Sequence, residues 1–429
     1  MKRVLVSSAW QSRKREYDVA VWKKRQNIFS VNAPMTEHFG LRFLKANAPE
    51  ITILEYPSRE RFLDELDKGW DVVGISFYIN ETNDAVEMAR AARERGVSEV
   101  WAGNYGSLNS GLEDHFDRLQ TGWGEAALAE LFDRDVVDIV HPPTYMHVRY
   151  KGFPVQKWGV LFTSRGCNKT CYFCQTPRFY RKPYPMALGA LDKVLWEYRR
   201  QGVGQVIVLD ENFGHFEDFT REVVELIHSY GLRWNPLTRV ETVYKNYDHW
   251  VDRGLCGVSI GAESLNQDSL DGAKKGNDSQ QIRRLLEWMR RDDLLVQVFY
   301  IIGFEQDTVS SIRDNIQELS EYHVDSPQIQ ILTPYPRTLL YRTIEEKYGI
   351  LDRDLSNYDS THLVWNHPNV TPEQMRELLF WSNDLLFTTR NSLRTLGKIV
   401  RRSASRFFFQ SKLSAPGAPV WAGQIDAAG

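Results

Sequence analysis

The sequence has few cysteines: four among 429 residues, three of them within one stretch of eight. A disulfide framework would need more cysteines in a small secreted chain, so this distribution favours a metal or redox centre in a reducing compartment. The chain also lacks any run of eighteen apolar residues, and residues 1–10 lack the apolar core of a secretory signal. We therefore expect a cytoplasmic protein without a membrane-spanning segment.

The sequence has no excess of charge of either sign. Its 53 lysines and arginines nearly balance 56 aspartates and glutamates, and the formal net charge is -3. This balance provides no overall field that would attract nucleic acid or an anionic membrane. We expect a small-molecule substrate as the partner, with no nucleic acid and no membrane.

Short β-rich runs alternate with amphipathic helical segments in the first third of the chain, with expected strands at residues 4–6, 72–75 and 99–101. Consecutive parallel strands need a crossover of about a dozen residues, which is usually a helix. The alternation therefore predicts an α/β fold, with a doubly wound, Rossmann-like domain over residues 1–140. The sequence His141, Pro142 and Pro143 then interrupts regular structure, so we assign 141–157 to a linker.

The alternation resumes after the linker with longer units, and strands are expected near residue 160 and at 206–209, 257–260, 296–301 and 329–332. These repeated units predict a partial (β/α)6 barrel of the TIM type over residues 158–345. Residues 346–412 are expected to be mostly helical, with Thr371 and Pro372 forming a cap and first turn. The tail, 413–429, is rich in proline and glycine and is expected to be disordered.

Three cysteines, Cys167, Cys171 and Cys174, follow an expected strand directly in a C-x3-C-x2-C arrangement. Three thiolates on one short loop can hold three irons of a cubane cluster, which leaves the fourth iron without a protein ligand. A structural zinc site is the alternative, but it needs four ligands and usually a second cysteine pair downstream. Only Cys256 follows, so the pattern favours a [4Fe-4S] cluster.

The cysteine loop, with Phe173 just before its third cysteine, resembles that of the radical SAM superfamily. In that family the open iron binds S-adenosylmethionine, which an electron from the cluster cleaves to a 5'-deoxyadenosyl radical. The resemblance implies an enzyme that abstracts hydrogen and takes electrons from a donor such as flavodoxin or ferredoxin. It also implies that the backbone near Phe173 approaches the adenine.

Two further segments are similar to cofactor loops of this family. The expected strand at 206–209 leads into Asp210, Glu211 and Asn212, which resemble the acidic loop that contacts the amino group of S-adenosylmethionine. An ammonium group needs hydrogen-bond acceptors, and all three side chains supply them. A later strand leads into Glu263 and Ser264, which resemble a cofactor-facing loop. We expect all five residues to bind the cofactor.

The first domain resembles the cobalamin-binding domain that precedes the barrel in many radical SAM methyltransferases. The resemblance places Ser76, Gly103 and Gly124 at strand ends near the corrin ring. It has two departures, because Ala102 and Tyr105 stand where glycine and histidine are common. A degenerate domain that shapes the substrate cavity is the other interpretation.

The reaction depends on which interpretation holds. With cobalamin, we expect C-methylation of a natural-product-like small molecule, and without it a dehydration, epimerisation or rearrangement of a sugar-like substrate. A non-catalytic iron-sulfur protein is a third possibility, but it would not need the loops around Asp210 and Glu263. Strand alternation places Cys256 on the outer face of its strand. We therefore expect it to be a packing residue that does not give a hydrogen atom to a substrate radical.

Overall fold

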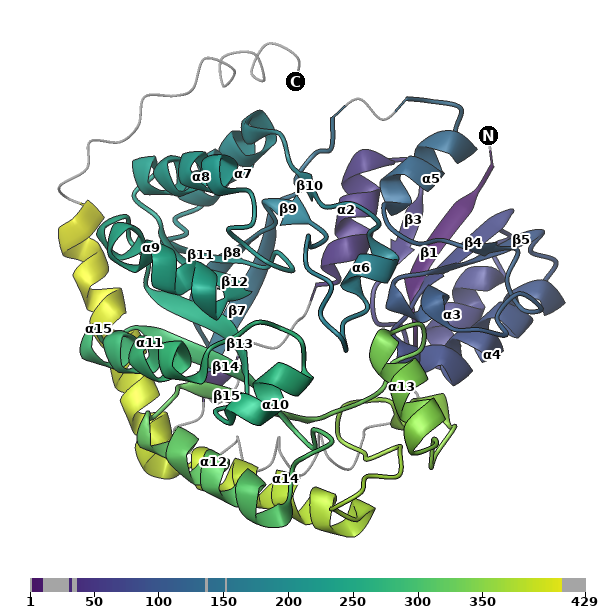
Figure 1. Ribbon diagram of the computed structural model, residues 1–429. Helices are drawn as coiled ribbons and strands as arrows, with labels where there is room; N and C mark the ends of the chain where they lie inside the picture. The colour runs from purple at the N-terminus through teal and green to yellow at the C-terminus, as the bar shows by residue number, and fades with distance from the viewer. Residues whose placement is uncertain (1, 11–30, 33–36, 136–137, 151–152, 411–429) are drawn as a thin grey trace.

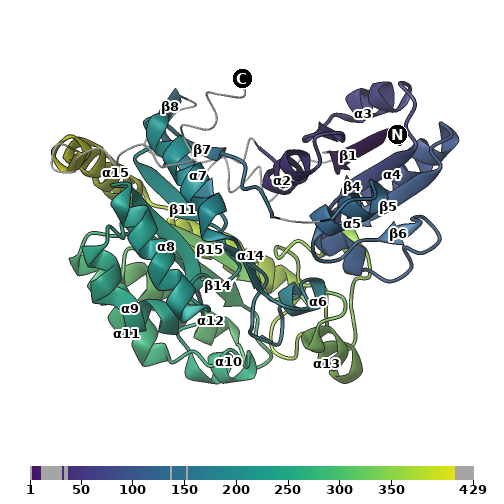
Figure 2. The ribbon, with the colours of Figure 1, turned by 90° about the horizontal axis from the view of Figure 1, so that it is seen from above.

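The computed structural model describes residues 2–10, 31–32, 37–135, 138–150 and 153–410. These residues form two α/β units and a helical C-terminal region (Figure 1). Seen from above, the two units lie side by side with helix α6, Thr176–Phe179, between them (Figure 2). The expected disordered tail lies outside the described residues.

The first unit is a five-stranded parallel sheet in the order β3-β1-β4-β5-β6. Its strands are β1 Val4–Ser8, β3 Thr52–Leu54, β4 Val72–Ser76, β5 Glu99–Gly103 and β6 Arg118–Leu119. Helices α3 (Arg59–Leu66) and α4 (Thr82–Glu94) pack on one face, and α2 (Phe39–Asn47) and α5 (Gly124–Leu131) on the other. This is the predicted doubly wound arrangement. The order in which strands are added to the sheet reverses between β1 and β4, and folds of this kind bind ligands at such a switch point.

The second unit is an eight-stranded sheet in the order β15-β14-β13-β12-β11-β8-β7-β2, whose six strands from β8 to β15 are parallel. At its edge, β2, Val31–Asn32, pairs antiparallel with β7. The six strands are β8 Phe153–Leu161, β11 Gln205–Val208, β12 Arg233–Arg239, β13 Gly257–Glu263, β14 Leu295–Ile302 and β15 Ser326–Ile331. Helices α7 Leu188–Arg200, α8 Glu217–Ser229, α9 Val240–Asp252, α11 Ser279–Arg291 and α12 Val309–Glu321 cover the outside of the curled sheet (Figure 1). The six parallel strands with their helices match the predicted partial barrel.

Two sequence-based assignments were wrong in this unit. The segment assigned to a linker, 141–157, contributes β7, Thr144–Tyr150, and the start of β8, which pair antiparallel and extend the sheet. The two prolines end before Thr144, so they do not interrupt these strands. No strand was expected between residues 209 and 257, where β12 lies. Pro236 stands in the middle of β12, although proline normally avoids central strands.

The C-terminal region is mostly helical, as predicted, and its helices pack against the outside of the barrel. Thr371 caps α14, Pro372–Leu386, by accepting from the backbone N–H of Gln374. Helix α14 packs against α12 and β15, and α15, Thr389–Gln410, runs along the outside of the barrel (Figure 1). Lys398 of α15 forms a buried ion pair with Asp325 at 2.8 Å. Among the described residues, no helix combines the length and apolar character that crossing a bilayer requires.

Candidate functional site

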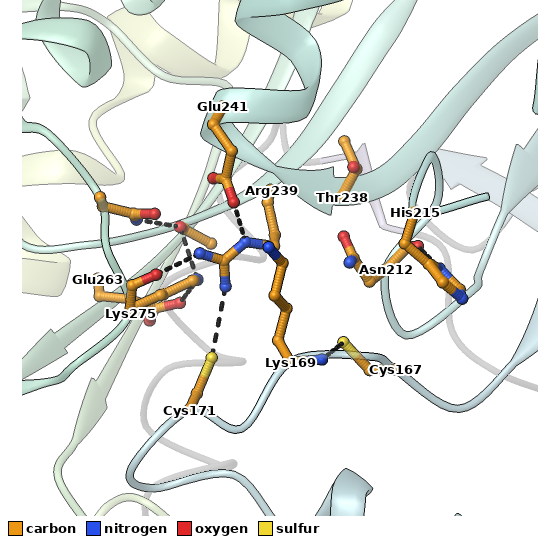
Figure 3. A network of polar contacts seen from close by, with 12 residues as sticks. Cys167, Lys169, Cys171, Asn212, His215, Thr238, Arg239, Glu241, Glu263 and Lys275 are labelled. Carbon is orange, nitrogen blue, oxygen red and sulfur yellow. Dashed lines mark hydrogen bonds and ion pairs between the residues drawn. The ribbon is translucent and has the colours of Figure 1, made fainter. Parts of the chain in front are cut away.

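The three clustered cysteines lie on the loop between β9, Ser164–Arg165, and α6, at the carboxyl end of β8. All three side chains are partly exposed, and the backbone N–H of Lys169 donates to Cys167 Sγ at 3.4 Å (Figure 3). Burial raises the pKa of the Cys167 and Cys174 thiols. Nearby cations or metal are therefore needed to stabilise their thiolates.

A cavity of about 300 Å³ opens beside this loop at the carboxyl ends of the barrel strands, and we call it the cluster cavity. Its walls include all three cysteines together with Phe173, Glu211, Asn212, Arg239, Glu263 and Lys275. No three His, Cys, Asp or Glu side chains in the described part of the chain converge on one metal-ion position. A cubane cluster needs a different arrangement, because each thiolate binds its own iron. Three thiols along one cavity wall fit such a cluster.

The cluster cavity contains a buried acceptor that no donor in the described part of the chain uses. Asn212 is only 2% exposed, and its Oδ1 atom has no hydrogen-bond partner among the described residues. A buried amide oxygen without a partner costs free energy, so a ligand that donates to it would bind there. This fits the ammonium group of S-adenosylmethionine.

Glu263 also reaches the cluster cavity, through an irregularity in β13. The register of β13 shifts between Gly261 and Glu263, and Glu263 adopts a positive φ of 66°. Its carboxylate forms a buried ion pair with Lys275, which also donates to the carbonyl oxygen of Gly261 at 2.8 Å. The pair presents a neutral but strongly polar wall to a ligand.

Asp210 and Ser264 do not line the cluster cavity, so their expected contact with the cofactor is not seen. Asp210 is 1% exposed and accepts from the Thr163 backbone N–H, Thr163 Oγ1 and Ser164 Oγ at 2.6 to 2.7 Å. Ser264 is buried, and its hydroxyl accepts from the Asn266 backbone N–H. Asp210 thus fastens the end of β8, from which the cysteine loop starts.

Replacing Asp210 with alanine is expected to destabilise the apoprotein by about 3 kcal/mol or more, because three buried donors lose their acceptor. The free energy of unfolding in urea measures this. Asp218→Ala is the matched control, because the Asp218 side chain is 94% exposed. Equal stability of the two variants would show that Asp210 does not brace the loop.

A second cavity of about 320 Å³ lies between the two units, and we call it the interdomain cavity. Ser76, Gly103 and Gly124, the residues expected near cobalamin, all line it. They stand at the ends of β4 and β5 and at the start of α5. A Cβ atom built on Gly103 would meet only the Ile75 carbonyl oxygen, at 3.7 Å, so this wall is open for a ligand.

Contacts across the interdomain cavity join the first domain to the cysteine loop. Arg165, just before the loop, forms an ion pair of 2.9 Å with Glu125 of α5, and both side chains are largely buried. The hydroxyl of Tyr105 lies 3.0 Å from Thr176 Oγ1, at the start of α6. These contacts hold the carboxyl ends of both sheets toward one another.

Glu211 lines both cavities. Its Oε2 atom accepts from the backbone N–H of Gly166 at 2.9 Å, next to the first cysteine. Burial raises the pKa of Glu211 from its ordinary value of 4.5 to about 7. A carboxyl group that changes charge near neutral pH therefore stands where the two cavities meet.

The raised pKa of Glu211 predicts a pH-dependent stability. The unfolded chain loses this proton near pH 4.5 and the folded chain near pH 7. The free energy of unfolding therefore decreases as the pH rises between these two values. Glu211→Gln should match the wild-type apoprotein near pH 4.5 and exceed it by up to about 3 kcal/mol at pH 8. Urea unfolding at both pH values tests this, with Glu222→Gln as an exposed control. A Glu211→Gln protein with no pH-dependent gain would contradict it.

Cys256 lies apart from both cavities, as strand alternation predicted. It is 3% exposed, and its thiol donates to the carbonyl oxygen of Trp234 at 3.3 Å. Its neighbours Val258 and Ile260 lie in the same core, whereas Gly261 and Glu263 line the cluster cavity. Cys256 is a packing residue.

Arg239 is a residue of the cluster cavity that the sequence analysis missed. It ends β12 and is 7% exposed, and its Nη1 donates to Cys171 Sγ at 3.4 Å (Figure 3). It was overlooked because no strand was predicted for residues 233–239, whose central proline, Pro236, is unusual in a strand. The regular spacing of the other strands was the one signal that could have exposed the gap between residues 209 and 257.

Comparison with known proteins agrees with this architecture. Residues 161–319 match the family model of the radical SAM superfamily. The chain is 27% identical to bacteriochlorophyllide d C-8(2)-methyltransferase of Chlorobaculum tepidum over 380 residues. This alignment covers 77% of this chain and 83% of that protein.

Two solved structures share the fold over both units. One is the radical S-adenosylmethionine methyltransferase TsrM from Kitasatospora setae with cobalamin and [4Fe-4S] cluster bound, with a TM-score of 0.60 and 17% identity over 81% of this chain and 75% of that one. The other is the cobalamin-dependent S-adenosylmethionine radical enzyme OxsB with aqua-cobalamin and S-adenosylmethionine bound, with a TM-score of 0.63 and 12% identity over 100% of this chain and 74% of that one. At these identities the likeness establishes the fold.

Proposed function

We propose that this chain is a radical SAM enzyme, a cobalamin-dependent C-methyltransferase acting on a natural-product-like small molecule, and the match of residues 161–319 to the family model supports this. The observation that carries this proposal is the shared wall of the two cavities at Glu211. Radical methylation requires the substrate to face both cofactors at once. A cavity at the cysteine loop that adjoins a cavity at the Rossmann-type switch point provides such a position.

The cysteine loop would hold the cluster through the thiolates of Cys167, Cys171 and Cys174. When bound, the cluster and S-adenosylmethionine supply a 5'-deoxyadenosyl radical, and methylcobalamin supplies the methyl group. In the cluster cavity the free Asn212 oxygen would accept from the amino group of S-adenosylmethionine. The Glu263 and Lys275 pair would offer a carboxylate to ribose hydroxyls and an ammonium to the carboxylate end.

The interdomain cavity would hold the corrin. Ser76 can donate a hydrogen bond there, and Gly103 lets the backbone approach a bulky ring. Gly124 lines the same cavity, but a Cβ atom at this position would meet Leu44 of α2 at 2.9 Å, so it is the packing of α5 on α2 that requires this glycine. The relatives and structures described above are named as methyltransferases or cobalamin-dependent enzymes, which supports the same assignment.

One observation favours the second candidate, a cobalamin-independent dehydratase or epimerase. Tyr105, at the position where histidine is common, lines the interdomain cavity and contacts Thr176 and Phe179. In that case the first domain would shape a substrate cavity in place of a corrin site. Either reaction needs one electron from outside, so we also propose a flavodoxin or ferredoxin partner and a cytoplasmic setting.

The proposed function is tested by expressing the protein anaerobically with and without added cobalamin and reconstituting it with iron and sulfide. We expect about four irons per chain, 5'-deoxyadenosine after reduction with S-adenosylmethionine, and cobalt only in the supplemented protein. Iron and 5'-deoxyadenosine without cobalt would select the dehydratase or epimerase. Iron without 5'-deoxyadenosine would leave a non-catalytic iron-sulfur protein.

A further inference from the structure

The guanidinium of Arg239 is aimed at a proposed cluster ligand. Its Nη1 donates to Cys171 Sγ at 3.4 Å, and its side chain is only 8% exposed (Figure 3). The contact links the carboxyl end of β12 to the middle of the cysteine loop, 68 residues away in the sequence. Hydrogen bonds to cluster-bound sulfur and buried charges nearby are two factors that set the reduction potential of an iron-sulfur cluster.

The orientation of Arg239 is determined by acceptors on its other sides. Its Nε donates to the carboxylate of Glu241, and its Nη2 donates to the backbone carbonyl of Lys275 (Figure 3). A guanidinium presents its donors in a rigid planar fork, so two occupied positions direct the third toward the sulfur. A lysine at this position could not make the three contacts together.

The charges around Arg239 leave a positive field at Cys171. The second cation among the described residues that line the cluster cavity, Lys275, is neutralised by Glu263. The counter-ion of Arg239 itself, Glu241, is bound at Nε, whereas Nη1 donates to the sulfur. Coulomb interactions weaken with distance, and the guanidinium is the charge in direct contact with the sulfur, so it outweighs its partner there.

We propose that Arg239 is a positioning residue that raises the reduction potential of the cluster by donating to the Cys171 thiolate. The inference rests on the proposed function, because it needs a cluster on the cysteine loop. The step concerned is the transfer of one electron from the flavodoxin or ferredoxin donor, which is oxidised, to the cluster, which is reduced. No bond forms or breaks at Arg239, and its proton stays in place.

The test is a redox titration of the reconstituted cluster, followed by electron paramagnetic resonance in the absence of S-adenosylmethionine. At one applied potential, Arg239→Met should lower the ratio of reduced to oxidised cluster about tenfold, which corresponds to a shift of about 59 mV for one electron. Glu241→Gln should shift the ratio the opposite way, because it removes the negative counter-ion and keeps the guanidinium.

Arg283→Met is the matched control. Arg283 also forms an ion pair within the barrel, with Glu318 at 2.6 Å, but it does not line the cluster cavity. Its potential should equal that of the wild type. A general loosening of the barrel would move this variant as well, and such a result would overturn the proposal.

The outcomes separate this inference from the function on which it rests. If the wild-type chain takes up no cluster, both the proposed function and the inference are contradicted. A wild type that loads a cluster, with unchanged potentials in Arg239→Met and Glu241→Gln, would sink the inference alone. If Arg239→Met loads no cluster, Glu241→Gln decides: a raised potential supports the proposal and an unchanged one overturns it.

Discussion

Alanine at any one of Cys167, Cys171 and Cys174 is expected to remove the iron-sulfur cluster and all 5'-deoxyadenosine formation. The three thiols line one wall of the cluster cavity, and each would bind a different iron. None of the others can replace a missing ligand, since each is needed at its own iron. Iron content and the absorbance of the reconstituted protein measure the loss, and product analysis after reduction measures the activity.

Cys256→Ala is the internal control for this experiment. Cys256 is the fourth cysteine of the chain, but it is buried behind β13 and lies in neither cavity. The variant should keep its iron and its 5'-deoxyadenosine formation, with only a modest loss of stability from the removed thiol. Wild-type iron loading in any single variant of the loop cysteines, or iron loss in Cys256→Ala, would contradict the assignment.

Leucine at Gly103 is expected to abolish cobalamin uptake while the fold remains intact. The backbone at Gly103 requires no positive φ, and an added Cβ meets nothing closer than the Ile75 carbonyl oxygen at 3.7 Å. The new side chain would therefore enter the interdomain cavity without disturbing β5, and it would occupy the space of the corrin. Corrin absorbance of protein purified from cobalamin-supplemented cells measures the loss.

Gly189→Leu provides the matched control, because Gly189 is an exposed position of α7 where an added Cβ meets no atom within 4 Å. It should bind as much cobalamin as the wild type. Normal cluster loading in Gly103→Leu would show that the effect is confined to the corrin site. Full corrin absorbance in Gly103→Leu would place cobalamin elsewhere and favour the domain as a substrate-shaping unit.

Local patterns predicted most of the elements because each pattern depends on few neighbours. Strands such as β1, β4, β11 and β14 are short apolar runs that burial on both faces of a parallel sheet requires. The capped start of α14 was also visible, because a capping box involves residues only three apart. The alternation within β13 correctly placed Cys256 in the core.

The assignments that went wrong involve partners far away in the sequence. Asp210 has the residue type and strand-end position of a cofactor ligand, but its oxygens are satisfied by Thr163 and Ser164, 47 and 46 residues earlier. β12 contains a central proline that local rules exclude, and its position between β11 and β13 overrides them. The prolines before β7 likewise concealed a strand.

Residue type and short-range spacing were enough to predict the α/β class and to single out the three cysteines of the cysteine loop as proposed cluster ligands. Which acidic residues reach the cavities depends on the folded arrangement, which places Glu211 between the two cavities and Asp210 behind the loop. It likewise brought Arg239 to Cys171. The reason is physical: a side chain's neighbours at a sheet edge come from different strands, and their distances depend on register and twist, which short-range patterns do not encode.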